Sequence, residues 1–396
     1  MKPLKYRLAN GETVYSLRVF IGTTSEGKKI IKSKKWQPDK KYTPNQLEKE
    51  LQKQILQFEK EVKQGTVIDD DITFKEFSEI WIEKYSRLKH KLKTIDSYES
   101  MLKRINIAIG NIKLSKLNTI TINSFLGNLK EAGTKLTDKN KQACLSDKSV
   151  KNYYVLISSI LTIAKKWSYI KNNPMDNIDT PKVLKHQVQA LEKADVDKLF
   201  ELLMYEPLKY QLFITLAIFS GARRGEMLGL KWSAIDFHYR LIRIDQTSQY
   251  VSSVGIYEDT TKSESSNRTL KLSDVVFDLF LRHKEEQEKD KERLEDLWVD
   301  NDYVFTKWNG EPMYPNTPYD WFNKFQKKHN LQHCSIHALR HTSATLLIMK
   351  GVNIKAVSGR LGHADTGTTT NIYASYLQTA DAMVAEALDN VLCDNK

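Results

Sequence analysis

Cysteine is scarce in this sequence, and long apolar runs are missing from it. Its 396 residues include three cysteines, Cys144, Cys334 and Cys393, which lie far apart and form no Cys-x-x-Cys or Cys/His spacing. A disulfide framework and a structural zinc site are therefore not expected, and a reducing cytoplasm fits this usage. No apolar run approaches the ~18 residues that cross a bilayer, and residues 1–7 lack the apolar stretch of a secretion signal. These features predict a protein that acts in the cytoplasm.

Acidic residues are too few to balance the basic ones. The sequence has 61 Lys and Arg against 49 Asp and Glu, which gives a formal net charge of +12. Such a surplus favours a polyanionic partner, and nucleic acid is the first candidate. The alternative is that the excess lysine only keeps the protein soluble. Hydrophobic residues make up 40% of the chain, as in ordinary globular proteins, and the length predicts two or three domains.

The first part of the chain, residues 1–66, predicts a small basic β-sheet followed by a helix. Thr13–Ile21 is rich in β-branched and aromatic residues, and Lys29–Ser33 has the pattern of a second short strand. A helix is expected from Pro44, because four apolar residues recur along one face: Leu47, Leu51, Ile55 and Phe58. Lysines crowd the second strand. This part is either a charged appendage or, as we favour, a reader of nucleic acid.

Two larger parts follow along the chain. Residues 72–180 are almost wholly helical in pattern, and lysines gather on the polar faces of the expected helices. The apolar stripes of these helices start at Phe74, Tyr98 and Tyr153. Residues 190–396 mix helices with a short β-hairpin, in which Tyr239–Gln246 and Arg268–Leu272 flank a long polar turn.

Two arginines in the last part stand at the expected ends of helices. Arg223 follows Gly221, a glycine that ends a buried apolar helix. Arg340 stands three residues after His337 at the start of another apolar helix, so both side chains can point at one anion. His337 and His341 have the spacing of a helical metal pair, but the segment lacks the glutamate of a His-Glu-x-x-His motif. A metal site is therefore the weaker interpretation.

Three further residues are candidates for chemistry. His363 directly follows a glycine that would end a helix, and Tyr373 stands ten residues later. Tyr376 is the nearby competing nucleophile, and the spacing from His363 favours Tyr373. Lys262 lies in the polar turn of the hairpin, and Lys271 in the same hairpin is an alternative to it. Each of these residues alone is ordinary, because a single buried tyrosine or histidine is far more often packed than catalytic.

Together the candidates form an ordered pattern that is far more specific. In order and spacing they resemble the active-site signature of tyrosine recombinases and phage integrases: Arg223, Lys262, His337, Arg340, His363 and Tyr373. The matching stretches are Gly221–Glu226, His337–Thr342, Leu361–His363 and Thr369–Tyr373. Ala222 departs from the leucine common in the family, which should not affect the role of the neighbouring arginine.

The resemblance implies a multidomain fold of the tyrosine recombinase type. An arm-type DNA-binding domain of β-sheet plus helix spans 1–66, and an all-α, SAM-like core-site-binding domain spans 72–180. A mainly α catalytic domain with a small β-hairpin or sheet spans 190–396. The implied partners are double-stranded DNA attachment sites (core and arm), further copies of the chain in a homotetramer on DNA, and accessory proteins such as a host bending protein and an excisionase. The implied host is a bacterial cell.

The resemblance also implies a reaction, and the residue types suit it. Paired guanidinium groups at Arg223 and Arg340 can clamp the phosphate oxygens, which gain charge as a nucleophile adds. His337 and His363 can add hydrogen bonds, and His337 can help move the tyrosine proton. Tyr373 would form a 3′-phosphotyrosyl intermediate with no cofactor, metal or ATP. Integration and excision of a mobile element would follow, from a phage or a conjugative element alike. In the same resemblance Lys262 is the general acid and Glu226 supports Arg223.

Three other classes of protein fit parts of the pattern. A DNA-binding regulator with the same fold would have no need of Tyr373. A type I topoisomerase would use the same phosphotyrosine chemistry but needs no basic N-terminal domain. A metal-dependent nuclease would need a carboxylate cluster, which the histidines lack. The C-terminal apolar residues indicate a short amphipathic helix that packs either on its own protomer or on a neighbour: Ala382, Val384, Leu388, Val391 and Leu392.

Overall fold

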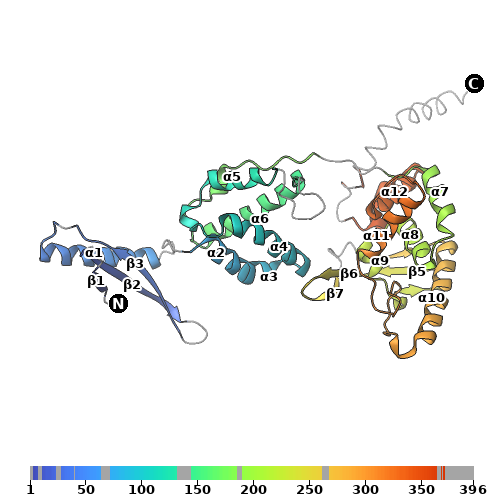
Figure 1. Ribbon diagram of the computed structural model, residues 1–396, viewed down its shortest axis with the longest axis horizontal. Coiled ribbons are helices and arrows are strands. Elements are labelled where there is room, and N and C mark those ends of the chain that lie inside the picture. Colours follow the sequence, from blue (N-terminus) through green and yellow to red (C-terminus); the bar gives the residue numbers. More distant parts are fainter. Residues whose placement is uncertain are drawn as a thin grey trace, which may run out of the picture. The chain divides into compact units, whose positions relative to one another are not determined.

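The computed structural model describes residues 3–7, 11–23, 28–39, 41–63, 72–131, 144–184, 190–260, 267–363, 367 and 369–370. Backbone contacts divide the chain into two units, Met1–Lys185 and His186–Lys396. Figure 1 shows the helices and strands of each unit. Within the described ranges, no helix has both the length and the apolar character needed to cross a membrane.

The N-terminal segment of the first unit is a three-stranded antiparallel sheet with a helix. The strands, in the order β1–β2–β3, are β1 (Leu4–Arg7), β2 (Thr13–Thr23) and β3 (Lys29–Trp36). Helix α1 (Pro44–Lys63) packs Phe58 against the apolar residues of β2. The two expected strands and the helix from Pro44 are confirmed. Strand β1 was not expected, because its alternation of Leu4 and Tyr6 with Lys5 and Arg7 covers only four residues and is too short to stand out as a strand signal.

The rest of the first unit is helical, as its three apolar stripes predict. Thr73 and Glu76 form a reciprocal capping box that begins the first of its helices. The stripes that begin at Phe74, Tyr98 and Tyr153 meet in one buried cluster. The elements are α2 (Phe74–Trp81), η1 (Ile82–Ser86), α3 (Arg87–Lys89), α4 (Leu92–Ile109), η2 (Leu114–Lys116), α5 (Thr119–Asn128), α6 (Asp147–Lys166) and η3 (Pro174–Asn177).

The second unit surrounds helix α8 (Leu208–Ser220), which is buried after its first turn. Its residues 212–218 are all buried, and their sequence is accordingly apolar on every side of the helix, with Thr215 as the one exception. The other helical elements are α7 (Lys193–Leu203), α9 (Arg224–Leu228), η4 (Trp232–Ala234), α10 (Asp274–Leu294), η6 (Glu295–Leu297), α11 (Thr317–Lys328), α12 (Ile336–Met349) and α13 (Ile354–Leu361). Figure 1 shows the strands beside these helices. They are β4 (Ile235–Asp236), β5 (Leu241–Ile244), β6 (Gln246–Val251), β7 (Gly255–Thr260) and β8 (Arg268–Lys271).

The hairpin of the second unit differs from the sequence-based expectation. Strands β5 and β8 pair antiparallel as expected, and β4 pairs with β5 to complete a three-stranded sheet. The prediction of a long polar turn between β5 and β8 is wrong. Over most of that segment, β6 and β7 form a second hairpin. These two strands are polar and half exposed on most positions, so their sequence lacks the alternation that marks a strand with one buried face.

Candidate active site

Two glycines end the helices from which the candidate site is built. Gly221 ends α8 with φ +61°, and Gly362 ends α13 with φ +68°, both in the left-handed region. A Cβ atom at Gly221 would lie 2.3 Å from Cδ2 of Leu361, so the position also lacks room for a side chain. Each glycine presents its carbonyl oxygen to an arginine. Nη1 of Arg340 donates to the Gly221 oxygen at 2.7 Å, and Nη2 of Arg223 donates to the Gly362 oxygen at 3.2 Å.

Arg223 is held by Glu226 at the start of α9. Its backbone N–H donates to Oε2 of Glu226 at 3.0 Å, and its Nη1 donates to Oε1 at 2.7 Å. The Glu226 side chain is 2% exposed, whereas 36% of the Arg223 side chain remains exposed. Burial alone would raise the pKa of Glu226, but the charges and hydrogen bonds of Arg268 and Arg223 outweigh it and lower the pKa. An ionised Glu226 therefore orients a guanidinium that still reaches solvent.

Arg340 is a buried cation with spare hydrogen-bonding capacity. The Ser335 hydroxyl accepts from the Ala338 N–H at 3.1 Å and begins α12, which carries Arg340 inward. Arg340 is 3% exposed, and its Nη2 has no hydrogen-bond partner among the described residues. Burial, together with the charge of Arg223, lowers the Arg340 pKa to about 9. A desolvated guanidinium with an open donor is costly unless an anion pairs with it, so this position is suited to an oxyanion.

Two histidines beside these arginines are held neutral. Loss of hydration lowers the pKa of His337 to about 4, with further contributions from His341, Arg340 and Arg223, although part of the His337 side chain is open to solvent. The pKa of His363 is also lowered to about 4, by partial burial and then by Arg340 and Arg223. Nδ1 of His363 lies 2.8 Å from the Thr369 hydroxyl. A neutral imidazole has a ring nitrogen free to accept a proton, and the negative charge of a bound phosphate would raise both pKa values toward the range that suits a general base.

His337 and His341 pack edge to face, with ring centroids 5.0 Å apart. In the part of the chain that the structure describes, no third histidine, cysteine or carboxylate joins them in a metal-binding group.

The structure brings together four of the six residues singled out in the sequence. Arg223, His337, Arg340 and His363 act on one another electrostatically. Lys262 and Tyr373 lie outside the described residues.

The chain before Lys262 is anchored at β7. The Glu258 carboxylate accepts from the Tyr303 hydroxyl at 2.5 Å and pairs with Nζ of Lys231 at 2.7 Å. These contacts tie the β6–β7 hairpin to the rest of the second unit. In the sequence, Lys262 stands two residues beyond the end of β7.

Sequence reasoning missed Arg268, which pairs with Glu226 at 2.9 Å. Arg268 was visible in the sequence only as the first residue of an expected strand. A charged residue at that position is usually exposed, and nothing local to the sequence indicates that the Arg268 side chain is buried.

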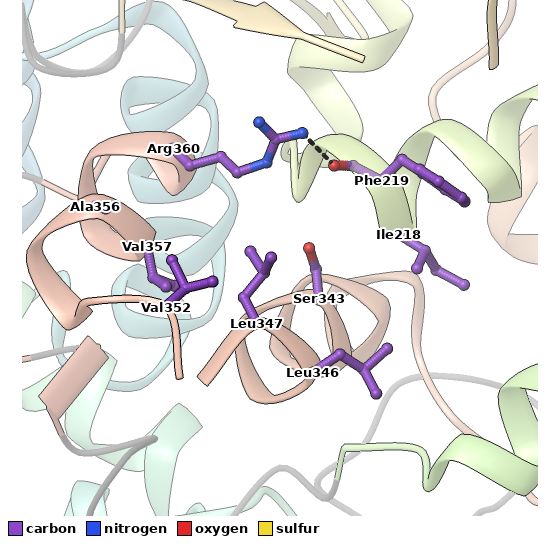
Figure 2. Close-up of a pocket in the computed structure, with 9 residues that line it drawn as sticks. All are labelled: Ile218, Phe219, Ser343, Leu346, Leu347, Val352, Ala356, Val357 and Arg360. Atoms are coloured by element: carbon purple, nitrogen blue, oxygen red, sulfur yellow. Dashed lines mark hydrogen bonds between the residues drawn. The ribbon is translucent and has the colours of Figure 1, made fainter. Parts of the chain in front are cut away.

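An apolar groove lies beside the site on the second unit. Figure 2 shows it between the end of α8, the second half of α12 and α13, and its volume is about 550 Å³. The Arg360 guanidinium crosses one side of it and donates to the Phe219 carbonyl oxygen at 2.7 Å. The apolar side chains that line the groove are Ile218, Phe219, Leu346, Leu347, Val352, Ala356 and Val357.

Known families and proteins are similar to this chain in sequence and in fold. The phage integrase family matches residues 189–379, and the N-terminal SAM-like domain of phage integrases matches residues 73–129. A tyrosine recombinase XerC-like protein of Caldanaerobacter subterraneus is 25% identical over 96% of this chain and 97% of its own length. The ICEBs1 integrase of Bacillus subtilis is 29% identical over 63% of this chain and 67% of its own length.

Solved structures agree in fold. The Tn1549 transposon integrase in complex with transposon right end DNA has a TM-score of 0.64 at 21% identity, covering 79% of this chain and 100% of that one. A lambda integrase dimer bound to a COC′ core site has a TM-score of 0.53 at 18% identity, covering 94% of this chain and 95% of that one.

The fold and the matches define the class of this protein as a tyrosine recombinase, an enzyme that transfers DNA strands. The chain belongs to the phage integrase family. The expected recombinase fold and the expected family are thereby confirmed.

Proposed function

We propose that this protein is a site-specific integrase that cleaves and rejoins DNA through a 3′-phosphotyrosyl intermediate on Tyr373. The reaction integrates and excises a mobile element and needs neither ATP nor a metal ion. The observation that carries the proposal is the buried Arg340, whose open Nη2 lies in the same site as the half-exposed Arg223 and two neutral histidines. Such a set of donors suits a phosphodiester that gains charge during attack.

The arginines stabilise the phosphate in the transition state. Arg340 is already desolvated and fixed on Gly221, so it needs little reorganisation when charge develops on a non-bridging oxygen. Arg223 is oriented by Glu226 and keeps an exposed face for a second oxygen. Guanidinium groups bind such oxygens in pairs of parallel hydrogen bonds, which lysine cannot reproduce.

The covalent step conserves the number of phosphodiester bonds. The Tyr373 oxygen forms a bond to phosphorus, its proton passes to a base such as neutral His337, and the bond from phosphorus to the 5′-oxygen breaks. Lys262, as general acid, supplies a proton to the leaving 5′-oxygen. A 5′-hydroxyl then attacks the phosphotyrosyl bond in the reverse sense. Because the intermediate retains the bond energy, rejoining needs no ATP.

In this proposal, three parts of the chain have separate roles in binding and cleaving DNA. Residues 1–66 bind arm-type sites, 72–180 bind core sites and 190–396 contain the catalytic site. The lysines of β3 support the first assignment, because Lys29, Lys34 and Lys35 are exposed on the sheet. A host bending protein and an excisionase complete the proposed set of partners, and the bacterial cytoplasm is the proposed location.

Covalent trapping in the absence of metal tests this function. The protein is incubated in EDTA, without ATP, with a nicked duplex that carries the end sequence of its element. The released 5′-hydroxyl strand diffuses away and leaves the intermediate trapped. We expect a DNA-linked protein band on a denaturing gel.

Other outcomes of this experiment identify the alternatives. A band that requires added magnesium contradicts metal independence. Bound DNA without any band favours a DNA-binding regulator. Relaxation of a supercoiled plasmid that contains no attachment site favours a topoisomerase.

We propose further that the enzyme acts as a tetramer on DNA, with the C-terminal segment of one protomer in the apolar groove of another. The support is complementary apolar character. The groove is lined by apolar side chains, and the sequence after Thr379 carries an apolar stripe of helical period. A lambda integrase tetramer bound to a Holliday junction has the same fold, at a TM-score of 0.53.

Truncation after Thr379 is expected to abolish the pairing of two DNA duplexes while binding of one duplex is retained. Val352→Glu, on the rim of the groove, should have the same effect, and combining the two changes should add nothing because both remove one contact. Native gels with two differently labelled duplexes measure the pairing. Unchanged pairing by the truncated chain would rule out a role for the tail.

A further inference from the structure

Arg268 is a buried cation that joins two parts of the active site. It is the first residue of β8 and pairs with Ile244 of β5. Its side chain is only 7% exposed, which is rare for an arginine unless it has fixed partners. Nη2 donates to Oε2 of Glu226 at 2.9 Å, and Nε donates to the Arg360 carbonyl oxygen at 2.7 Å. One side chain thus reaches both α9 and α13.

The contact of Arg268 with Glu226 changes the net charge of the group of side chains around Arg223. Oε2 of Glu226 accepts from both Arg268 and the Arg223 backbone, while Oε1 accepts from the Arg223 side chain. With only Glu226 and Arg223 present, the pair would be neutral. Arg268 adds a positive charge, so the cluster of two arginines and one carboxylate remains cationic. This positive charge adds to that of Arg340, so the phosphate would meet a larger net positive charge than Arg340 and a neutral ion pair would provide.

The contact with Arg360 fixes the end of α13. The Arg360 carbonyl lies in the last turn of this helix, two residues before Gly362, which accepts from Arg223. His363 follows directly. A shift of β8 relative to α13 would therefore move both the second anchor of Arg223 and the backbone of His363.

We propose that Arg268 is a positioning residue of the catalytic site, which aligns Arg223 and His363 on one phosphate through Glu226 and the carboxyl end of α13. The inference rests on the proposed function and deepens it. Arg268 has its Nη2 and Nε committed to protein atoms, so its role is to hold the groups that touch DNA.

A dependence on pH separates this role from simple structural support. Without Arg268, burial of Glu226 is offset only by its hydrogen bonds with Arg223, so the Glu226 pKa should rise and the carboxyl should take up a proton more readily as the pH falls. A protonated Glu226 cannot hold Arg223 as an ion pair. The charged groups around Glu226 are Arg223, Arg268 and Arg340, and, around the adjoining hollow, Lys231, Arg243 and Asp245.

The experiment compares full-length Arg268→Gln, Arg268→Lys and wild-type protein in single-turnover covalent trapping, from about pH 5 to about pH 8. We expect Arg268→Gln to bind DNA normally and to cleave about 10- to 100-fold more slowly at neutral pH. The ratio of its rate to the wild-type rate should fall further as the pH decreases. Arg268→Lys keeps the positive charge, so the ratio of its rate to the wild-type rate should not change with pH. Arg243→Gln is the matched control, because Arg243 lines the same hollow but pairs with Asp245.

The outcomes separate this inference from the proposed function. An Arg268→Gln rate equal to wild type, or a loss that is the same at every pH and matched by a lower melting temperature, would overturn the positioning role. If Arg268→Gln does not fold, Arg268→Lys and Glu226→Gln are used to test how the rate relative to wild type depends on pH. A wild-type protein that forms no adduct would instead refute the proposed function, and this inference with it.

Discussion

Replacing Tyr373 by phenylalanine is expected to abolish the covalent DNA adduct completely while DNA binding stays within about twofold. The phenyl ring has no oxygen to attack phosphorus, so the phosphotyrosyl bond cannot form at this position. The arginines and histidines are untouched, so the phosphate should still bind. Denaturing gels measure the adduct, and mobility shifts on the same duplex measure binding.

Tyr376 provides the matched control for this prediction. It lies three residues after Tyr373, so Tyr376→Phe removes a neighbouring hydroxyl without removing the proposed nucleophile. We expect the Tyr376→Phe protein to form adduct at close to the wild-type rate. Adduct that persists in Tyr373→Phe and disappears in Tyr376→Phe would assign the nucleophile to Tyr376 instead.

Arg340→Lys is expected to slow cleavage by ~10²–10³, which corresponds to the loss of one preorganised donor to the transition state. Lysine keeps the positive charge, but its single nitrogen cannot hold the Gly221 carbonyl and a phosphate oxygen in the fixed planar geometry of the two guanidinium nitrogens. Ground-state affinity should change little, because one phosphate contact among many contributes only a small part of it. Rates are measured in single turnover at saturating protein.

A melting curve shows whether this loss is catalytic. The wild-type site buries a guanidinium whose Nη2 has no partner among the described residues, so the free enzyme gains little stability from that group. The melting temperature of Arg340→Lys should therefore stay close to wild type. A large drop in melting temperature together with weaker DNA binding would mean that Arg340 serves mainly to hold α8 and α12 together.

Local patterns in the sequence determined most of the helices and the positions of the candidate residues. The glycines at 221 and 362 were expected to end helices, and both do so in the left-handed conformation. Helix α12 begins at Ile336, where the apolar helix was expected to start, and this places His337 and Arg340 in one turn. These features depend on contacts within a few residues of the chain, so periodicity and capping are sufficient to recognise them.

The β6–β7 hairpin could not be recognised in this way. Its strands are polar, and their place is set by the contacts of Glu258 with Tyr303 and Lys231. Tyr303 lies 45 residues from Glu258 in the sequence. No local pattern contains that information.

The order of many elements, the family resemblance and the residues proposed for chemistry follow from patterns along the chain. Which of those residues are buried, which are charged and what holds them follow from contacts between distant segments. The bond from Arg340 to Gly221 spans 119 residues, and the bond from Arg268 to the Arg360 carbonyl spans 92. Burial and pKa depend on such distant neighbours, because the dielectric surroundings of a side chain are created by packing and not by its own segment.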